Sequence, residues 1–400
     1  MNSTPLPARV FAARLGVAML FIANALVFAT IVTRYPELKD RFDLGELTFG
    51  VMVACGPLGS VLGSLIAGRL VARLGAVPVA VTSSALLGVL LMVAGFAGGP
   101  VILGALLFAI GFGDATGDVG NNSQGLSIQR WMGRSIINGL HGAWSAGAIA
   151  GALLGAAALG FAIPIEIYLP AMGGIIMVGS VCALPLVRVA TAPAAAQMRP
   201  NSGRGGGLSA ILVAACAIAA IGAFLEDVGS TWGGVFVVAA TGATVAEAAI
   251  PFVALMGALT VGRFTADILV DRIGSVGTLR VGSVAAFVGM LTATLAPQTW
   301  VVAVGLGILG LGIAPMIPLA MDAADRAPGL RAGAGLAAAA TLMRLGLFAS
   351  PLLVGAIAEW AGLRIAIAAC LLVPAAAFAL AGRLAHNERL VAPGVPDITS

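Results

Sequence analysis

Apolar stretches of about twenty residues follow one another along the whole chain, separated by short polar or glycine- and proline-containing breaks. Polar and apolar positions do not alternate within the stretches, which predicts membrane-spanning α-helices rather than the strands of a barrel. The expected fold class is an all-α membrane protein with about twelve spans. The predicted helices cover residues 11–33, 47–70, 77–96, 101–127, 136–159, 164–186, 208–233, 244–269, 278–296, 300–321, 333–357 and 363–384.

One polar interval is much longer than the others. Residues 188–207 are rich in Pro, Gly and Ala, a composition typical of a flexible linker. This interval divides the predicted helices into a six-helix bundle at 1–187 and a second one, with a short tail, at 208–400. Residues 63–75 also resemble residues 262–274, and such duplication is typical of transporters whose substrate site lies between the halves near the midplane.

Composition and the placement of basic residues support a membrane location. Apolar residues make up 60% of the chain and charged residues 10%, which is too little charge to cover a soluble surface. Most arginines, with Arg130, Arg263 and Arg331 among them, fall on the predicted side of the N-terminus. The positive-inside rule then predicts a multi-pass plasma-membrane protein with both termini cytoplasmic. The near-absence of Lys beside abundant Ala, Gly and Arg suits a bacterial gene, so the membrane is expected to be the bacterial inner membrane.

Several other classes of protein are excluded. The basic residues form no patch with interleaved aromatics, so no nucleic acid is expected as a partner. Two histidines and scattered cysteines predict no metal centre, and the chain contains no Walker motif for ATP. We expect no cofactor, no enzymatic activity, and a monomer whose partners are the lipid bilayer, a small-molecule substrate and protons.

Two loops carry copies of one motif. The copies consist of Gly68, Arg73 and Gly75 in the first half and of Asp267, Asp271, Arg272 and Gly274 in the second. This motif resembles the signature of the major facilitator superfamily, with Ala72 at the position of its first-half Asp. The resemblance implies a twelve-helix transporter in which the two loops act as cytoplasmic latches during gating.

The fourth and fifth predicted helices resemble, more narrowly, the fucose:proton symporter branch of that superfamily. Asp118 precedes Asn122, a basic turn and a glycine-rich helix. The resemblance implies that Asp118 carries the coupling proton. That branch also has an acid in its first helix, where this chain offers Asn24, which we consider a candidate substrate-binding residue.

Charged side chains inside the spans are the main candidates for function, because each costs about 2.5–3.5 kcal/mol at the bilayer centre. Asp114 and Asp118 share one helix face with Asn121 and Asn122, which predicts a polar stripe facing water and substrate. Arg344 lies at a similar depth when residues are counted from the cytoplasmic side. We expect Asp118 to exchange between a proton and Arg344 or an anionic substrate group. The alternative is a permanent structural ion pair.

Five further residues have two interpretations each. Glu226 and Asp227 are predicted near the outer mouth, either as a gate or proton entry or as a solvated helix end. His141 is either a proton relay or a packed, hydrogen-bonded side chain. Trp144 and Trp232 either stack on the substrate or anchor their helices at the membrane interface.

The expected function is secondary active transport by alternating access, coupled to protons, of a small polar or anionic organic solute such as a sugar or carboxylate. The alternative with the same fold is drug or metabolite efflux by proton antiport, which predicts an aromatic-rich cavity with few polar groups. An intramembrane enzyme or a sensor is a third possibility. The sequence shows neither a nucleophile–base pair nor an appended soluble domain to support it.

Overall fold

The computed structural model describes residues 6–132, 136–188, 209–328, 330 and 334–391. Throughout these residues the chain forms helices and short connections, and this part contains no strand. The predicted linker lies almost entirely outside the described residues. The helices are α1 (Leu6–Val32), α2 (Tyr35–Arg41), α3 (Glu46–Leu74), α4 (Ala76–Ala94), α5 (Pro100–Met132), α6 (Ile137–Gly160), α7 (Ile165–Arg188), α8 (Ala210–Asp227), the π-helical turn η1 (Val228–Trp232), α9 (Gly233–Thr241), α10 (Ala249–Leu295), α11 (Thr299–Ile313), α12 (Met316–Asp325), α13 (Ala334–Ala361), α14 (Leu363–Ala369) and α15 (Leu372–Val391).

The structure confirms the expected fold class. Eleven helical segments of the described chain are long and apolar enough to cross a membrane. One of them, α10, is kinked at Gly274, whose φ of 73° and ψ of 168° favour glycine strongly over any other residue. This segment is therefore two spans joined end to end, which makes twelve spans in the described part. Gly75, in the equivalent loop of the first half, has a similar backbone, with φ 89° and ψ 156°.

The predicted boundaries between the seventh and eighth spans are wrong. The span predicted to end at residue 233 runs over Ala210–Thr241, because α8 continues through η1 into α9. The next span begins at Ala249 instead of residue 244. The intervening residues form a turn in which Glu247 accepts a hydrogen bond from the backbone N–H of Thr244 at 2.8 Å.

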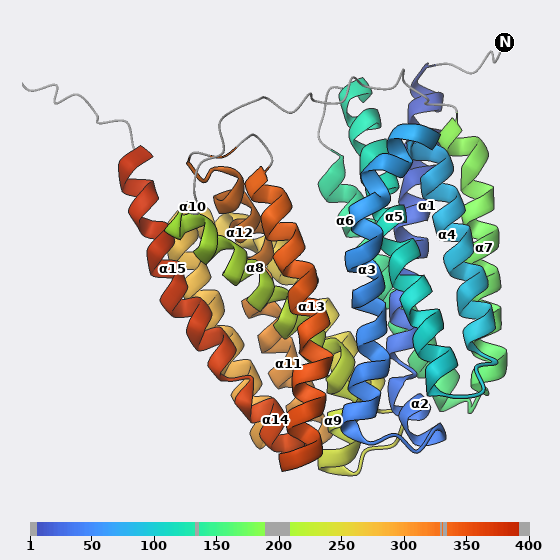
Figure 1. The fold of residues 1–400 in the computed structure, drawn as a ribbon, viewed down its shortest axis with the longest axis vertical. Helices are drawn as coiled ribbons and strands as arrows, with labels where there is room; N and C mark the ends of the chain where they lie inside the picture. The colour runs from blue at the N-terminus through green and yellow to red at the C-terminus, as the bar shows by residue number, and fades with distance from the viewer. Residues whose placement is uncertain (1–5, 133–135, 189–208, 329, 331–333, 392–400) are drawn as a thin grey trace, which may run out of the picture.

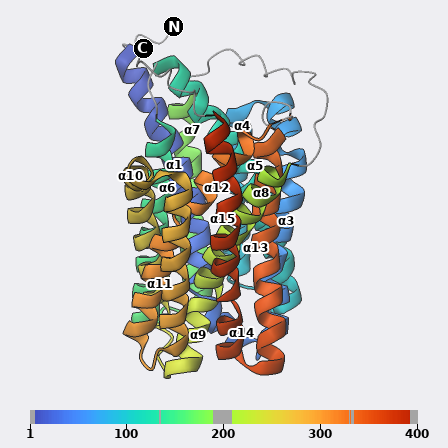
Figure 2. The same cartoon turned by 90° about the vertical axis from the view of Figure 1, so that its left-hand side faces the viewer.

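The helices pack into two bundles, as Figure 1 shows. The N-terminal bundle contains α1 to α7 and the C-terminal bundle contains α8 to α15; Figure 2 shows α10, α11 and α15 on one face of the latter. We call the end of the molecule where α1 begins and α15 ends the terminal end. The opposite end, where α2, α9 and α14 lie, is called the closed end. The ribbons of the two bundles meet toward the closed end and diverge toward the terminal end (Figure 1).

Small residues allow the bundles to meet near the closed end. Gly50 of α3 packs directly against the backbone carbonyl of Pro351 in α13, and Gly355 of α13 faces the backbone of Glu46. Glu359 adds a polar contact, because its Oε2 accepts a hydrogen bond from the backbone N–H of Leu47 at 3.1 Å. Close backbone approach through glycine is a common way for helices to associate in membranes.

Candidate functional site

The centre of the molecule contains an ion pair that joins the two bundles. Arg344 of α13 and Asp118 of α5 approach to 4.0 Å between Nη2 and Oδ2. Asp118 lies near the middle of α5, and its side chain keeps 46% of its surface exposed. The Nδ2 of Asn122, one turn further along α5, donates a hydrogen bond to Asp118 Oδ1 at 2.8 Å. The structure thus brings together two residues that the sequence placed at similar depth, while their roles remain predictions.

Arg344 has unused hydrogen-bonding capacity. Its side chain is only 15% exposed, yet it makes no hydrogen bond within the described residues, and its buried Nε has no partner there. A guanidinium presents five N–H donors in a planar fork that fits a carboxylate or phosphate. A buried donor without a partner is unfavourable, so this group is suited to receive an anion.

Asn24 of α1 connects its own helix to α5 and α6. Its Nδ2 donates to Asp114 Oδ1 at 2.5 Å, and its Oδ1 accepts a hydrogen bond from Trp144 Nε1 at 2.8 Å. The Trp144 ring also stacks on Phe28, with ring centroids 6.3 Å apart. Trp144 therefore belongs to a polar network inside the bundle, and its proposed role as an interfacial anchor is wrong.

The predicted polar stripe on α5 divides into two parts. Asp114, Asp118 and Asn122 are partly exposed, whereas Asn121 is only 2% exposed. The Oδ1 of Asn121 has no hydrogen-bond partner among the described residues. In this conformation Asn121 lies behind the exposed face of the stripe instead of lining it.

Glu226 and Asp227 lie near the middle of their span, so their predicted position at the outer mouth is wrong. The span Ala210–Thr241 continues well past both residues. Glu226 Oε2 lies 3.5 Å from Nη2 of Arg263 in α10, a residue that the sequence had placed on the cytoplasmic side. Asp227 is 7% exposed and accepts a hydrogen bond from Thr231 at 3.0 Å, which excludes a solvated helix end. Both acids directly precede the π-helical turn, and such turns are frequent at functional sites.

His141 lies where α6 of the N-terminal bundle approaches α10 of the C-terminal bundle. Its ring packs edge-on against Phe21, with centroids 5.3 Å apart, but the residue remains exposed. The neighbouring Gly142 lies close to Phe264, since a Cβ at this glycine would be 3.7 Å from the end of that ring. His141 is therefore located on the part of α6 that approaches α10 beside Arg263.

A layer of aromatic side chains separates these charged residues from the closed end. Phe28 of α1 meets Phe252 of α10 with centroids 5.9 Å apart. Phe49 of α3 meets the fully buried Trp232 of η1 at 5.2 Å, and Tyr35 packs against Phe49 at 5.6 Å. The first two contacts join the two bundles, so Trp232 packs between them and does not anchor its helix at the membrane interface. The sequence did not reveal these phenylalanines, because an aromatic residue facing lipid looks the same as one facing another bundle.

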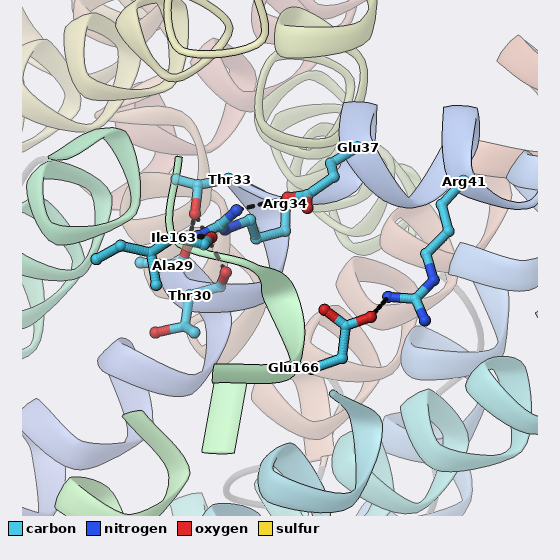
Figure 3. A network of polar contacts seen from close by, with 8 residues as sticks. All are labelled: Ala29, Thr30, Thr33, Arg34, Glu37, Arg41, Ile163 and Glu166. Carbon is cyan, nitrogen blue, oxygen red and sulfur yellow. Dashed lines mark hydrogen bonds and ion pairs between the residues drawn. The ribbon is translucent and has the colours of Figure 1, made fainter. Parts of the chain in front are cut away.

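Two arginines at the closed end have a structural role (Figure 3). Arg34, with 1% of its side chain exposed, is bonded to Glu37 and donates to the carbonyl of Ile163 at 3.1 Å. Arg41 of α2 is bonded to Glu166 of α7. These contacts connect α2 to the rest of the N-terminal bundle.

The predicted gating loops lie exposed at the terminal end. The exposed members of the two motifs are Gly68, Arg73, Gly75, Asp267, Asp271 and Arg272, while Gly274 is half-buried. None of the four charged members forms an ion pair with another described residue. The latch contacts implied by the family resemblance are therefore absent from this part of the structure, where the bundles diverge.

Comparisons with known proteins agree with this architecture. The family model described as Major Facilitator Superfamily matches residues 17–351. The chain is 29% identical to an uncharacterised transporter of Sinorhizobium fredii over 88% of this chain and 92% of the relative. It is 24% identical to an uncharacterised MFS-type transporter of Yersinia pestis, over 91% of this chain and 94% of that protein.

Two solved structures share the fold. The nucleoside transporter NupG, as a point mutant, superimposes with a TM-score of 0.73 at 14% identity, covering 94% of this chain and 99% of the other. A bacterial homologue of the human lysosomal transporter Spinster, in an inward-facing and occupied conformation, gives the same TM-score and identity over 96% and 98% of the two chains. At this identity the likeness concerns the fold alone.

Proposed function

The chain belongs to the major facilitator superfamily, and we propose that it transports a small polar or anionic organic solute across the bacterial inner membrane by proton-coupled alternating access. One observation carries the proposal: Asp118 and Arg344 meet between the bundles at mid-span, 4.0 Å apart, and the arginine has unfilled donors. Asp118 would exchange between Arg344 and a proton.

Charge balance explains why solute and proton would move together. The pair formed by Asp118 and Arg344 is neutral when both side chains are ionised. An anion bound to Arg344 replaces Asp118 and leaves a carboxylate without a cation in a region where an unpaired charge is costly. Uptake of a proton by Asp118 restores neutrality, so one proton accompanies each negative charge of the solute.

The surrounding residues fit alternating access. The aromatic layer and the glycine contacts close one end of the molecule, while the gating loops are exposed at the other. With both termini in the cytoplasm, as the arginine distribution predicts, this conformation is open to the cytoplasm. Substrate and proton would exchange there with Asp118, Asn122 and Arg344.

Sugars remain within the proposed substrate range because of the resemblance to the fucose:proton symporter branch. In that branch an acid stands in the first helix, and here Asn24 of α1 is hydrogen-bonded to Asp114. A carboxyl group from α5 is thus present beside the first helix. Asp114 would serve as a second proton-binding group next to Asp118.

Efflux of cationic compounds by proton antiport is the second candidate. It is favoured by Asp114, whose only hydrogen-bond partner among the described residues is the neutral amide of Asn24. A carboxylate without a cationic partner can bind a cationic solute as well as a proton. The test below distinguishes the two candidates.

The experiment begins with the thermal stability of the purified protein at two pH values in the presence of sugars, nucleosides, carboxylates, amino acids and cationic drugs. A ligand of the folded protein raises Tm by mass action. The best ligand is then used in proteoliposomes with an imposed pH gradient. We expect Asp118→Asn to abolish uphill accumulation and to retain exchange of labelled for unlabelled solute.

The matched control is Asp322→Asn, because Asp322 pairs with Arg326 in an exposed position outside the site. This variant should accumulate solute as the natural protein does. Uphill accumulation by Asp118→Asn at the natural level would refute the proposal. If cationic drugs alone raised the Tm of the protein, proton antiport of cationic compounds would replace the proposed function.

A further inference from the structure

Two arginines of the C-terminal bundle lie in the middle of their spans, and both are incompletely bonded. Arg344 is 4.0 Å from Asp118, and Arg263 is 3.5 Å from Glu226. Neither guanidinium makes a hydrogen bond within the described part of the chain. Their side chains keep 15% and 35% of their surface exposed, respectively.

The arginines at the closed end provide an internal comparison. Arg34 and Arg41 each close a direct hydrogen bond to a carboxylate, Glu37 and Glu166 respectively. A charge-assisted bond of that kind is short and is what a structural ion pair normally makes. The central arginines instead stay at ion-pair distance from their acids without a direct hydrogen bond to the carboxylate, which is the state expected of cations that await another anion.

Both central pairs lie at mid-span on helices that face the N-terminal bundle. Gly142 of α6, next to His141, lies close to Phe264, the residue that follows Arg263, since a Cβ at this glycine would be 3.7 Å from the end of that ring. The pair of Arg263 and Glu226 therefore lies beside α6 of the N-terminal bundle, and the pair of Arg344 and Asp118 joins α13 to α5 of the same bundle. Two further acids lie on the same helices: Asp114 and Asp227 are bonded to the neutral side chains of Asn24 and Thr231.

We infer that Arg263 is a second substrate-binding cation and that the transported solute carries two anionic groups, as a small dicarboxylate does. This inference rests on the proposed function and narrows its substrate class. A monoanion fills the donors of one arginine only. A dianion fills both, displaces Asp118 and Glu226 together, and is neutralised when each of these carboxylates takes one proton.

The test uses the purified full-length protein and compares acids of equal size but different charge. Succinate and glutarate are compared with their half-amides, succinamate and glutaramate, by ligand-induced shifts of Tm. A lost charge-assisted contact weakens binding by roughly 10- to 100-fold, so the natural protein should bind each diacid tighter than its half-amide by about that factor. Arg263→Gln should remove this discrimination while retaining half-amide binding.

Two further variants separate binding from folding. Arg263→Gln leaves Glu226 without its cation, so Arg263→Gln combined with Glu226→Gln removes both charges and should fold normally while still failing to discriminate. Arg41→Gln removes a cation from an exposed ion pair at the closed end and should discriminate as the natural protein does.

The inference is overturned if none of the four probes stabilises the natural protein, if diacid and half-amide bind equally, or if the double variant still prefers the diacid. With any of these three results, the proposed function still holds if another solute binds and Asp118→Asn abolishes the uphill transport of that solute. Undiminished uphill transport by Asp118→Asn refutes the proposed function itself.

Discussion

Replacing Gly50 by alanine should shift the protein away from the conformation described here. A Cβ at this position would collide with the backbone carbonyl of Pro351, and Gly355 approaches the same part of α3. The obstacle is backbone, so no side-chain rotation can relieve it. The collision exists only while α3 and α13 are together, and it is absent from a conformation in which the closed end has opened.

The expected size of this effect follows from the energetics of overpacking. Inserting a methyl group into a tightly packed contact costs about 1–3 kcal/mol. The penalty applies to one of two conformations, so their population ratio should change by about 5- to 150-fold toward the form open at the other end. A transporter that cycles between the two forms should then lose transport rate without losing its fold.

Distances between spin labels provide the assay. One pair of labels replaces Leu74 and Ile273, which are exposed at the terminal end, and a second pair replaces Phe161 and Trp360, which are exposed at the closed end. Gly50→Ala should shorten the first distance and lengthen the second. Gly174→Ala is the control, since a Cβ at Gly174 meets no atom within 4 Å. Unchanged distance distributions in Gly50→Ala would refute the conclusion that the contact between Gly50 and Pro351 holds the closed end shut.

Two other predictions concern the loops. Gly274→Ala should lower the free energy of unfolding by about 1–3 kcal/mol, because alanine is strained at a φ of 73°. Gly257→Ala in the same helix should leave this free energy unchanged, since a Cβ there meets no atom within 4 Å, and unfolding of both variants in detergent measures the difference. Hydrogen bonds from the backbone N–H and the hydroxyl of Thr244 hold the pKa of Glu247 below its usual range. The ionised Glu247 therefore stabilises the folded protein at a pH above the pKa that this residue has in the unfolded chain. This stability is lost as the pH falls through the lower pKa that it has in the folded protein. The Tm difference between the natural protein and Glu247→Gln should therefore shrink at acidic pH; a constant difference contradicts this.

The sequence predicted the helices because each span must satisfy its own backbone and must be about as long as the bilayer is thick. The same constant rise per residue placed Asp118 and Arg344 at one depth, and the structure has them 4.0 Å apart. Counting residues along two helices from the same side of the membrane predicts which side chains lie at equal depth when both helix starts are assigned correctly.

Where a boundary was misplaced, the partner of a charge was missed. The span that begins at residue 208 was predicted to end at residue 233, although it continues to Thr241 through a π-helical turn. Glu226 was consequently placed near the outer face and Arg263 near the inner one, so no contact between them was predicted. The aromatic layer was missed for a different reason, because hydrophobicity does not distinguish a residue facing lipid from one facing the other bundle.

The two central ion pairs differ in a way that links proton binding to movement. Glu226 and Arg263 both belong to the C-terminal bundle and travel together when the bundles rock. Asp118 and Arg344 belong to different bundles, so their distance changes with the conformation. The attraction of Arg344 for the Asp118 carboxylate is therefore part of the energy difference between conformations, and a proton on Asp118 removes it. A ligand shifts such an equilibrium only by its unequal affinity for the two states. Asp118 binds its proton more strongly in whichever state holds Arg344 further away, which gives protons a means of setting the direction of the cycle.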